Sequence, residues 1–480
     1  MRKAFLLFTA AVLALSPAAA QRLRYLDPQD VAEAQRYNAA LVQELGGAET
    51  GSRASYVSAV GQRVGAYSGV ANSNQALHFT TLNSAVENAF SVPGGYVYVT
   101  RQLMALMDDE SQLAFALGHE VGHVAANHAH VREQYEQRST LGVFGQIVGA
   151  IFGSGAADLI RARSTLDLLS FSREQEYQAD TLGLRYMTAA GYDPAGAVGV
   201  LAALTRASAL EARVQGRTNR RTPEWASTHP LSENRLQRAL GEAEATGRLN
   251  TGIRNRDVYL NTLEGITVDD DPSQGMIEGA TFTHPDLRIQ FSVPQGYLMS
   301  NGTDAVTISG SAGKAQFRQG PPDLDQAIAF AYRLLTRDQF RIPYQQPQRL
   351  VINGMQAALT TARVNTDSGA MDVSVIAYQW DAQRVFYFAM LTPAGYGVSP
   401  FVPMINSLRR ITPAEAASIR PRVIHVQTVR PGDTVQSLSS RMAYRDFKLE
   451  RFLSLNALSP GSTLVPGRKV KLIVYGTRRS

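Results

Sequence analysis

The sequence predicts a multidomain fold class with three units. The first is mainly α-helical with a small β-sheet, the second is α+β with an antiparallel sheet, and the third is a small strand-helix-helix-strand unit. Length is one reason, because a single hydrophobic core rarely organises as many as 480 residues. The other is the spacing of apolar residues, which changes from a helical period to strict alternation after three aspartates at 269–271.

The first unit is predicted to be mostly helical from about residue 27 to residue 264. Two strand-like blocks interrupt it, LHFTTLN at 77–83 and GGYVYVT at 94–100. Asp193 followed by Pro194 predicts a helix start, because Asp is a favoured N-cap and Pro suits the first helical position. A second helix carries an apolar stripe from Leu113 to Val124, and Asp108 is its expected cap.

Strict alternation of apolar and polar residues predicts the antiparallel sheet of the second unit. It occurs in DLRIQFSV (286–293), MDVSVIAYQW (371–380) and RVFYFAML (384–391), with one helical stripe between them. The expected boundaries are 21–270 for the first unit, 275–410 for the second, 411–423 for a linker and 424–480 for the last unit. No catalytic constellation is found in 275–410.

The N-terminus predicts a secretory signal peptide, residues 1–20, cut after Ala20. Two basic residues, a short apolar run and a series of alanines follow one another there. Cysteine is absent, which together with export fits a bacterial periplasm. The net charge is +6, but the basic residues are scattered along the sequence and form no single stripe. Nucleic acid is therefore not an expected partner. The apolar segment 141–155 is too short to span a membrane; it is read as a core hairpin or a lid, and membrane contact is left open.

The stretch GHEVGHVAANHAH, residues 118–130, holds four of the eight histidines. His119 and His123 are four residues apart, so on a helix both imidazoles reach one metal ion from the same face. Glu120 then lies where a general base for a metal-activated water is needed. The pattern predicts one zinc ion per chain, against the alternative of a solvated helix with incidental histidines.

The other two histidines of the stretch are excluded as ligands if the helix continues. At about 100° per residue, His128 points away from His119 and is expected to be a packed or hydrogen-bonded core residue. His130 has the right direction but lies about 10 Å along the axis beyond His123, too far to share bonds of roughly 2 Å.

A catalytic zinc needs a third protein ligand and an open position. The segment FSREQEYQADTLGLRYM offers Glu176 and Asp180 on one helical face, with small Ala179 and Gly183 allowing close packing. Glu176 is the expected ligand and Asp180 the expected acceptor for an imidazole N–H. By spacing alone, Glu174 competes with Glu176.

These residues resemble those of the CAAX prenyl protease-like zinc metallopeptidases, a family of gluzincins. Within that family, they resemble the soluble periplasmic branch. The resemblance rests on HEVGH, SREQEYQAD (172–180), NAFSVPGGYVYVTRQLM (88–104) and THPLSENR (228–235). It implies that Glu176 is the third zinc ligand and makes Glu174 an improbable one. It also implies that His229 is either a switchable fourth ligand or a stabiliser of the oxyanion, and that Arg235 holds this segment or the developing charge.

The family also implies an edge strand that pairs with an extended substrate. Gly95, Tyr96, Val97 and Tyr98 are the expected residues, although the same pattern fits a buried core strand. The last unit resembles a LysM module, which either binds the glycan of peptidoglycan or serves only for packing.

The predicted function is a zinc endopeptidase of the bacterial periplasm that cleaves misfolded or unassembled envelope proteins. The alternative is a chaperone-like or peptidoglycan-associated binding protein whose metal site is latent or structural.

Overall fold

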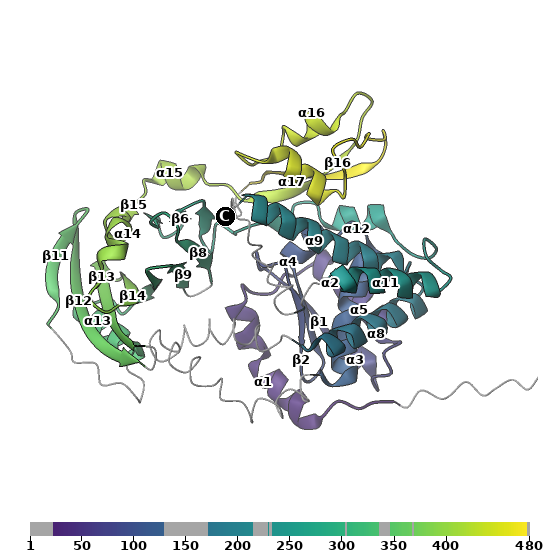
Figure 1. The fold of residues 1–480 in the computed structure, drawn as a ribbon, viewed down its shortest axis with the longest axis horizontal. Helices are drawn as coiled ribbons and strands as arrows, with labels where there is room; N and C mark the ends of the chain where they lie inside the picture. The colour runs from purple at the N-terminus through teal and green to yellow at the C-terminus, as the bar shows by residue number, and fades with distance from the viewer. Residues whose placement is uncertain are drawn as a thin grey trace, which may run out of the picture.

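The protein has a helical unit and two sheet-containing units (Figure 1). The computed structural model describes residues 23–128, 171–214, 229, 233–302, 305–335, 346–366 and 369–477. The predicted signal peptide, the apolar segment 141–155 and His130 lie outside the described residues. We call residues 23–268 the N-terminal unit, 276–410 the sheet unit and 422–475 the C-terminal unit.

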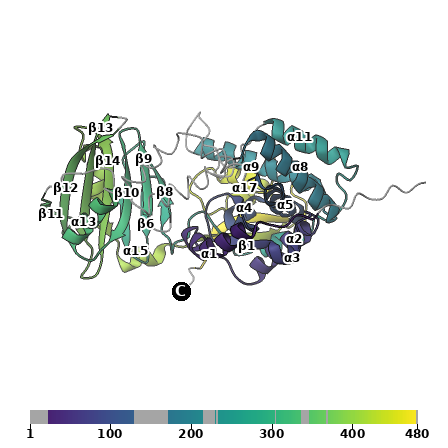
Figure 2. The ribbon, with the colours of Figure 1, turned by 90° about the horizontal axis from the view of Figure 1, so that it is seen from below.

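The N-terminal unit packs helices around a small sheet. Its helices are α1 (Pro28–Glu44), α2 (Ser52–Gly65), α3 (Ser73–Ala76), α4 (Arg101–Leu106), α5 (Glu110–Ala126), α8 (Arg173–Ala189), α9 (Ala195–Val214), α11 (Glu233–Ala245) and α12 (Arg256–Thr262). Its strands are β1 (His78–Leu82), β2 (Ala89–Val92), β3 (Tyr96–Thr100) and β4 (Thr267–Val268). Helix α5 lies in the interior, packed against α2, α8 and α9 (Figure 2).

Helix α5 begins one residue later than expected and ends sharply. Asp109, not Asp108, is the N-cap, and its carboxylate accepts a hydrogen bond from the backbone N–H of Gln112. At the other end Asn127 adopts the left-handed conformation that Asn tolerates well, with φ 55°, and stops the helix. The helix therefore cannot be extrapolated past Ala126.

The small residues predicted for close helix packing do bring α5 and α8 together. A Cβ added at Gly183 would lie 2.7 Å from the backbone nitrogen of His119, and one added at Gly122 would lie 3.1 Å from the carbonyl oxygen of Ala179. The two backbones touch there, so side chains that flank the contact are forced to converge.

The prediction that Gly95, Tyr96, Val97 and Tyr98 form an edge strand is wrong. The strand order is β1-β3-β2, so β3 is central, pairing in parallel with β1 and antiparallel with β2. All five residues of β3 are buried. Its continuous apolar and aromatic run is the pattern of a strand covered on both faces. Among the described strands, β2 is the edge next to α5.

One helix of the described part, α9, is long and apolar enough to cross a membrane by length and composition. Its carboxylate cap is the one predicted, since Asp193 accepts from the backbone N–H of Ala195 at 2.9 Å. It packs against α5, α11 and α17 (Lys448–Leu455) and contributes Val200, Leu201 and Leu204 to the main core. These contacts are typical of a core helix.

The sheet unit confirms the alternation seen in the sequence. Seven strands are arranged in the order β11-β12-β13-β14-β10-β9-β8. They are β8 (Leu298–Asn301), β9 (Ala305–Gly310), β10 (Gly313–Gly320), β11 (Gln348–Ile352), β12 (Met355–Thr366), β13 (Gly369–Gln379) and β14 (Val385–Pro393). Helix α13 (Leu324–Leu335) covers one face. The other face packs against a smaller sheet of β5 (Met276–Glu278), β6 (Thr281–His284), β7 (Ile289–Ser292) and β15 (Arg409–Arg410), with η1 (Ser399–Phe401) and α14 (Val402–Ser407).

The C-terminal unit has the expected element order. After α15 (Pro413–Ser418) come β16 (Arg422–Thr428), α16 (Val435–Ser439), α17 (Lys448–Leu455) and β17 (Lys469–Tyr475). The unit is docked onto the N-terminal unit: β16 pairs with β4, and Phe452 and Leu472 belong to the same hydrophobic core as α5 and α9. In Figure 1 it lies beside α9 and α12. Its assignment to the LysM family stays a prediction.

A buried lysine joins these two units. Lys471, 1% exposed, donates to the carbonyl oxygens of Ala105, Leu106 and Met107 at 3.0, 3.3 and 2.7 Å, and its ammonium lies 3.2 Å from Asp108 Oδ1. These carbonyls are at the C-terminal end of α4, where a cation is favoured. Burial lowers the pKa of Lys471, and Asp108 opposes that shift.

Replacing Lys471 with Met should therefore lower the free energy of unfolding by about 3 kcal/mol, because it leaves three carbonyls and a carboxylate without their buried cation. Urea denaturation measures this, and the N-terminal and C-terminal units should both unfold earlier. Lys469→Met is the matched control, since its ammonium lies at the surface on Asn261. Equal loss in both variants would contradict the buried-cation interpretation.

Candidate metal centre

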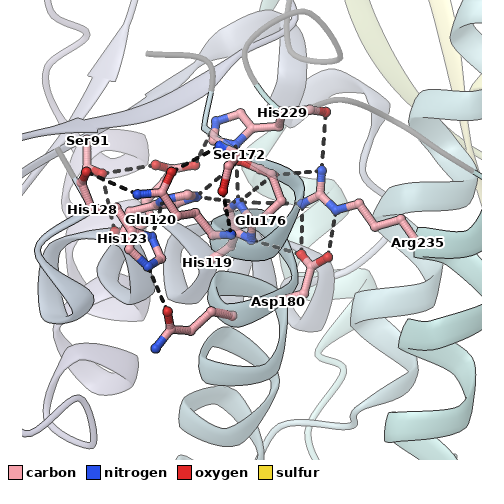
Figure 3. Close-up of polar contacts among 12 residues, drawn as sticks. Ser91, His119, Glu120, His123, His128, Ser172, Glu176, Asp180, His229 and Arg235 are labelled. Carbon is pink, nitrogen blue, oxygen red and sulfur yellow. Dashed lines mark hydrogen bonds and ion pairs between the residues drawn. The ribbon is translucent and has the colours of Figure 1, made fainter. Parts of the chain in front are cut away.

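Two helices and one loop residue bring four potential ligands together (Figure 3). Helix α5 supplies His119 and His123, α8 supplies Glu176, and His229 approaches from the segment before α11. One donor atom from each lies within 4.8 Å of all the others, and all four residues are buried. Glu174, the competitor of Glu176 in the sequence, is on the exposed side of α8.

The donor atoms have the spacing of a small tetrahedral site. His119 Nε2 lies 3.0 Å from His123 Nε2 and 3.2 Å from His229 Nδ1. Glu176 Oε1 lies 2.9 Å from His229 Nδ1 and 3.4 Å from His123 Nε2. Ligands about 2.0–2.1 Å from a tetrahedral zinc are separated by about 3.4 Å, and three imidazole nitrogens with one carboxylate are a zinc-type donor set. The residues present thus fit one zinc ion.

Asp180 orients the first histidine, as expected. Its Oδ1 lies 2.9 Å from His119 Nδ1, so the opposite nitrogen, Nε2, points into the cluster. Burial disfavours the charged form of His119, but hydrogen bonds to the Asp180 and Glu176 carboxylates outweigh burial and raise the pKa of His119 to about 9.

Arg235 holds both carboxylates and the loop histidine. Its guanidinium donates to Asp180 through Nε at 2.6 Å and Nη2 at 2.8 Å, lies 2.9 Å from Glu176 Oε2, and donates to the backbone carbonyl of His229 at 3.2 Å. Burial raises carboxyl pKa values, but His229 and Arg235 hold the pKa of Glu176 well below its usual range, and Arg235 helps lower the pKa of Asp180 to about 2. Both groups are therefore carboxylates at neutral pH.

His128 is a core residue, but the prediction that it points away from the metal face is wrong. Because α5 ends at Ala126 and the chain turns at Asn127, the side chain of His128 comes to lie against His123. Its Nδ1 lies 2.9 Å from Nδ1 of His123, and its Nε2 lies 3.0 Å from Gln178 Oε1. Burial lowers the pKa of His128. The asparagine before it was the signal for the helix end.

Glu120 is buried beside the cluster and outside the ligand set. Ser91 of β2 donates to its carboxylate at 3.1 Å and to its backbone carbonyl at 3.2 Å. On the other side Nε2 of His229 lies 3.4 Å from Glu120 Oε1. Sequence reasoning missed Ser91, although it stands in the segment 88–104 that carries the family resemblance. The Glu120 carboxylate is thus held between the edge strand β2 and the cluster of four donor atoms.

Comparison with known proteins agrees with this geometry. The model of peptidase family M48 matches residues 52–243, which include all four donors, Glu120, Asp180 and Arg235. Over residues 52–243 the chain is thus similar to the peptidases of family M48.

Two proteases are similar to this chain over part of its length. The beta-barrel assembly-enhancing protease of Escherichia coli K12 is 32% identical over 198 residues, covering 39% of this chain and 38% of that protein. The mitochondrial metalloendopeptidase OMA1 of Schizosaccharomyces pombe is 32% identical over 183 residues, covering 38% of this chain and 51% of that protein. The chain thus spans between a third and about half of the length of these two relatives.

Arg235→Met should destabilise the N-terminal unit by roughly 3–5 kcal/mol, because it leaves two buried carboxylates without their cation. The pKa values of Glu176 and Asp180 should rise for the same reason. Chemical denaturation of the metal-free protein measures the first effect. Arg238→Met, one turn away on α11 with an exposed ion pair to Glu242, is the control and should change stability by well under about 1 kcal/mol. Comparable losses in the two variants would contradict the assignment.

Metal uptake should release a proton at pH 7. The pKa of His119 is raised to about 9 in the metal-free protein, so below that pH a metal ion must displace a proton from Nε2. As the pH is lowered from 9 to 7, zinc affinity is therefore expected to fall about tenfold per pH unit. Calorimetry at pH 7 in two buffers of different ionisation enthalpy measures the proton release. Identical heats in both buffers would contradict the raised pKa.

Proposed function

We propose that this protein is a zinc-dependent endopeptidase of the bacterial periplasm that hydrolyses peptide bonds of misfolded or unassembled envelope proteins. The observation that carries the proposal is the buried convergence of His119, His123 and Glu176 beside a carboxylate, Glu120, that is outside the ligand set. The match to peptidase family M48 supports a metallopeptidase. The name of the bacterial relative supports an envelope setting, whereas another relative is mitochondrial.

Zinc bound by His119, His123 and Glu176 would supply Lewis acidity, which activates water and polarises a carbonyl group. The protein's own contribution is the proton transfer. Glu120 accepts the proton of the attacking water at its carboxylate and then donates it to the leaving amine. Ser91 orients that carboxylate through its 3.1 Å hydrogen bond, and the buried surroundings exclude bulk water.

His229 is placed to govern access to the site. Its Nδ1 is one of the four converging donors, and its Nε2 faces Glu120. In this arrangement it occupies the fourth position of a tetrahedral site, the one a catalytic zinc keeps open for water. We therefore assign this arrangement to a closed form, from which His229 must withdraw for catalysis. This same observation favours the second candidate function, a binding protein with a latent site.

Substrate is proposed to bind along β2 instead of β3. Strand β2 is the edge next to α5, and Ser91 within it contacts Glu120. An extended polypeptide added to this edge would pass the cluster with recognition mainly through its backbone, which suits unfolded substrates. A cavity of about 590 Å³ has Asp27, Val92, His123 and Phe171 among its lining residues and is large enough for one or two substrate side chains. Peptidoglycan binding by residues 424–480 stays a prediction.

Glu120→Gln should retain zinc and lower casein cleavage roughly 100- to 10,000-fold, because it removes the proton acceptor and leaves the ligands in place. His229→Ala should raise cleavage above wild type by opening the fourth position. Zinc content by elemental analysis and casein digestion measure both. Glu174→Gln, on the exposed side of α8, is the matched control and should cleave like wild type.

The two functions give different results. A latent site predicts no turnover by either wild type or His229→Ala, with substrate binding unaffected by Glu120→Gln. Cleavage that persists in zinc-loaded Glu120→Gln would overturn the proposed proton transfer.

A further inference from the structure

The two metal-site histidines of α5 are oriented by different partners. His119 faces the carboxylate of Asp180, as a metal-binding histidine commonly does. His123 has no carboxylate at its outer nitrogen among the contacts of the described residues. Its Nδ1 instead faces another imidazole, Nδ1 of His128, at 2.9 Å. This second arrangement has no role in the chemistry set out above.

A proton must lie between two imidazole nitrogens that are so close, and the next contact indicates where it belongs. Gln178 Oε1 lies 3.0 Å from Nε2 of His128. An amide oxygen only accepts, so His128 carries its hydrogen on Nε2. A neutral His128 then has a lone pair on Nδ1, which accepts the hydrogen of Nδ1 of His123. The remaining nitrogen of His123, Nε2, is left with a lone pair that points into the four-donor cluster.

The surroundings keep His128 in this place. The left-handed turn at Asn127 leads the chain into it, and Gln175 of α8 donates to its backbone carbonyl at 3.3 Å. The side chain is 3% exposed. Phe171 stacks on the His123 ring, with centroids 3.8 Å apart, so that ring is confined on its face as well as at its outer nitrogen. Packing alone would explain burial of His128 but not two well-placed nitrogen contacts.

We infer that His128 and Gln178 form a positioning relay that holds His123 in the form protonated on Nδ1, with Nε2 directed at the metal. The inference rests on the proposed metal site. His128 does not touch the reacting atoms; it acts through His123. A neutral imidazole in this place, where a second carboxylate would be the common alternative, adds no negative charge to a centre that already buries Glu120, Glu176 and Asp180.

The first test reads the tautomer of His123 in the metal-free protein. Long-range ¹H–¹⁵N correlation spectra of histidine-labelled protein should show His123 protonated on Nδ1 in wild type. His128→Asn keeps an acceptor near the former Nδ1 and should preserve that form, whereas His128→Leu removes the acceptor and should give a mixture. The same tautomer in His128→Leu as in wild type would overturn the relay.

The second test measures zinc affinity by competition with a chelator. His128→Leu should bind zinc about 10- to 100-fold more weakly, the range found when the outer partner of a metal-binding histidine is lost, and His128→Asn should recover most of the loss. Gln178→Ala, at an exposed position, should give a smaller loss in a protein of unchanged thermal stability. His425→Leu, at a half-buried histidine of the C-terminal unit that contacts Glu264, is the control.

The two proposals fail in different ways. If wild type binds no zinc, the metal site itself is wrong. If wild type binds zinc and His128→Leu binds it equally well, the metal site stands and the relay is wrong.

Discussion

The backbone contact between α5 and α8 is the constraint on which the metal centre depends. Gly183 allows α8 to lie against the backbone of His119, and Gly122 allows α5 to lie against Ala179. A side chain at Gly183 would have to occupy space that the peptide of His119 already fills. Only at this separation does Glu176 reach the nitrogens of both His119 and His123. The ligand set is therefore a consequence of two helices that touch, with His119 at one contact and His123 next to the other.

Close helix packing also concentrates charge, and the rest of the centre compensates for it. Glu120, Glu176 and Asp180 are buried together, which is costly unless cations or hydrogen-bond donors are supplied. Arg235 supplies the cation, Ser91 supplies a donor to Glu120, and Asp180 in turn orients His119. Since Arg235 also donates to the backbone of His229, the residue that neutralises the carboxylates also holds the loop histidine over the cluster.

The C-terminal unit shares its hydrophobic core with the N-terminal unit, whereas the sheet unit has separate cores. The C-terminal unit also adds strands to β4 and inserts Lys471 at the end of α4, just before the N-cap of α5. A module that looks like a separate attachment in the sequence is thus part of the support of the helix that carries the metal ligands.

The sequence by itself determined what depends on neighbouring residues along the chain. The spacing of His119 and His123 places both on one helical face, and the alternation from Ile289 to Val293 makes a half-buried strand. The order of elements in the last unit was implied by its resemblance to a LysM module. The tertiary structure decided what depends on distant neighbours. Apolar β3 reads equally as an edge or a central strand, and only its pairing with β1 and β2 makes it central. His128 was placed on the far face because a helical wheel assumes a helix that continues, whereas the turn at Asn127 and the acceptor on Gln178 return it to His123. Helical and strand periodicities depend on residues close in the sequence, so they can be predicted from it. Strand order and side-chain partners depend on which surfaces can be buried together, and only the tertiary structure decides that.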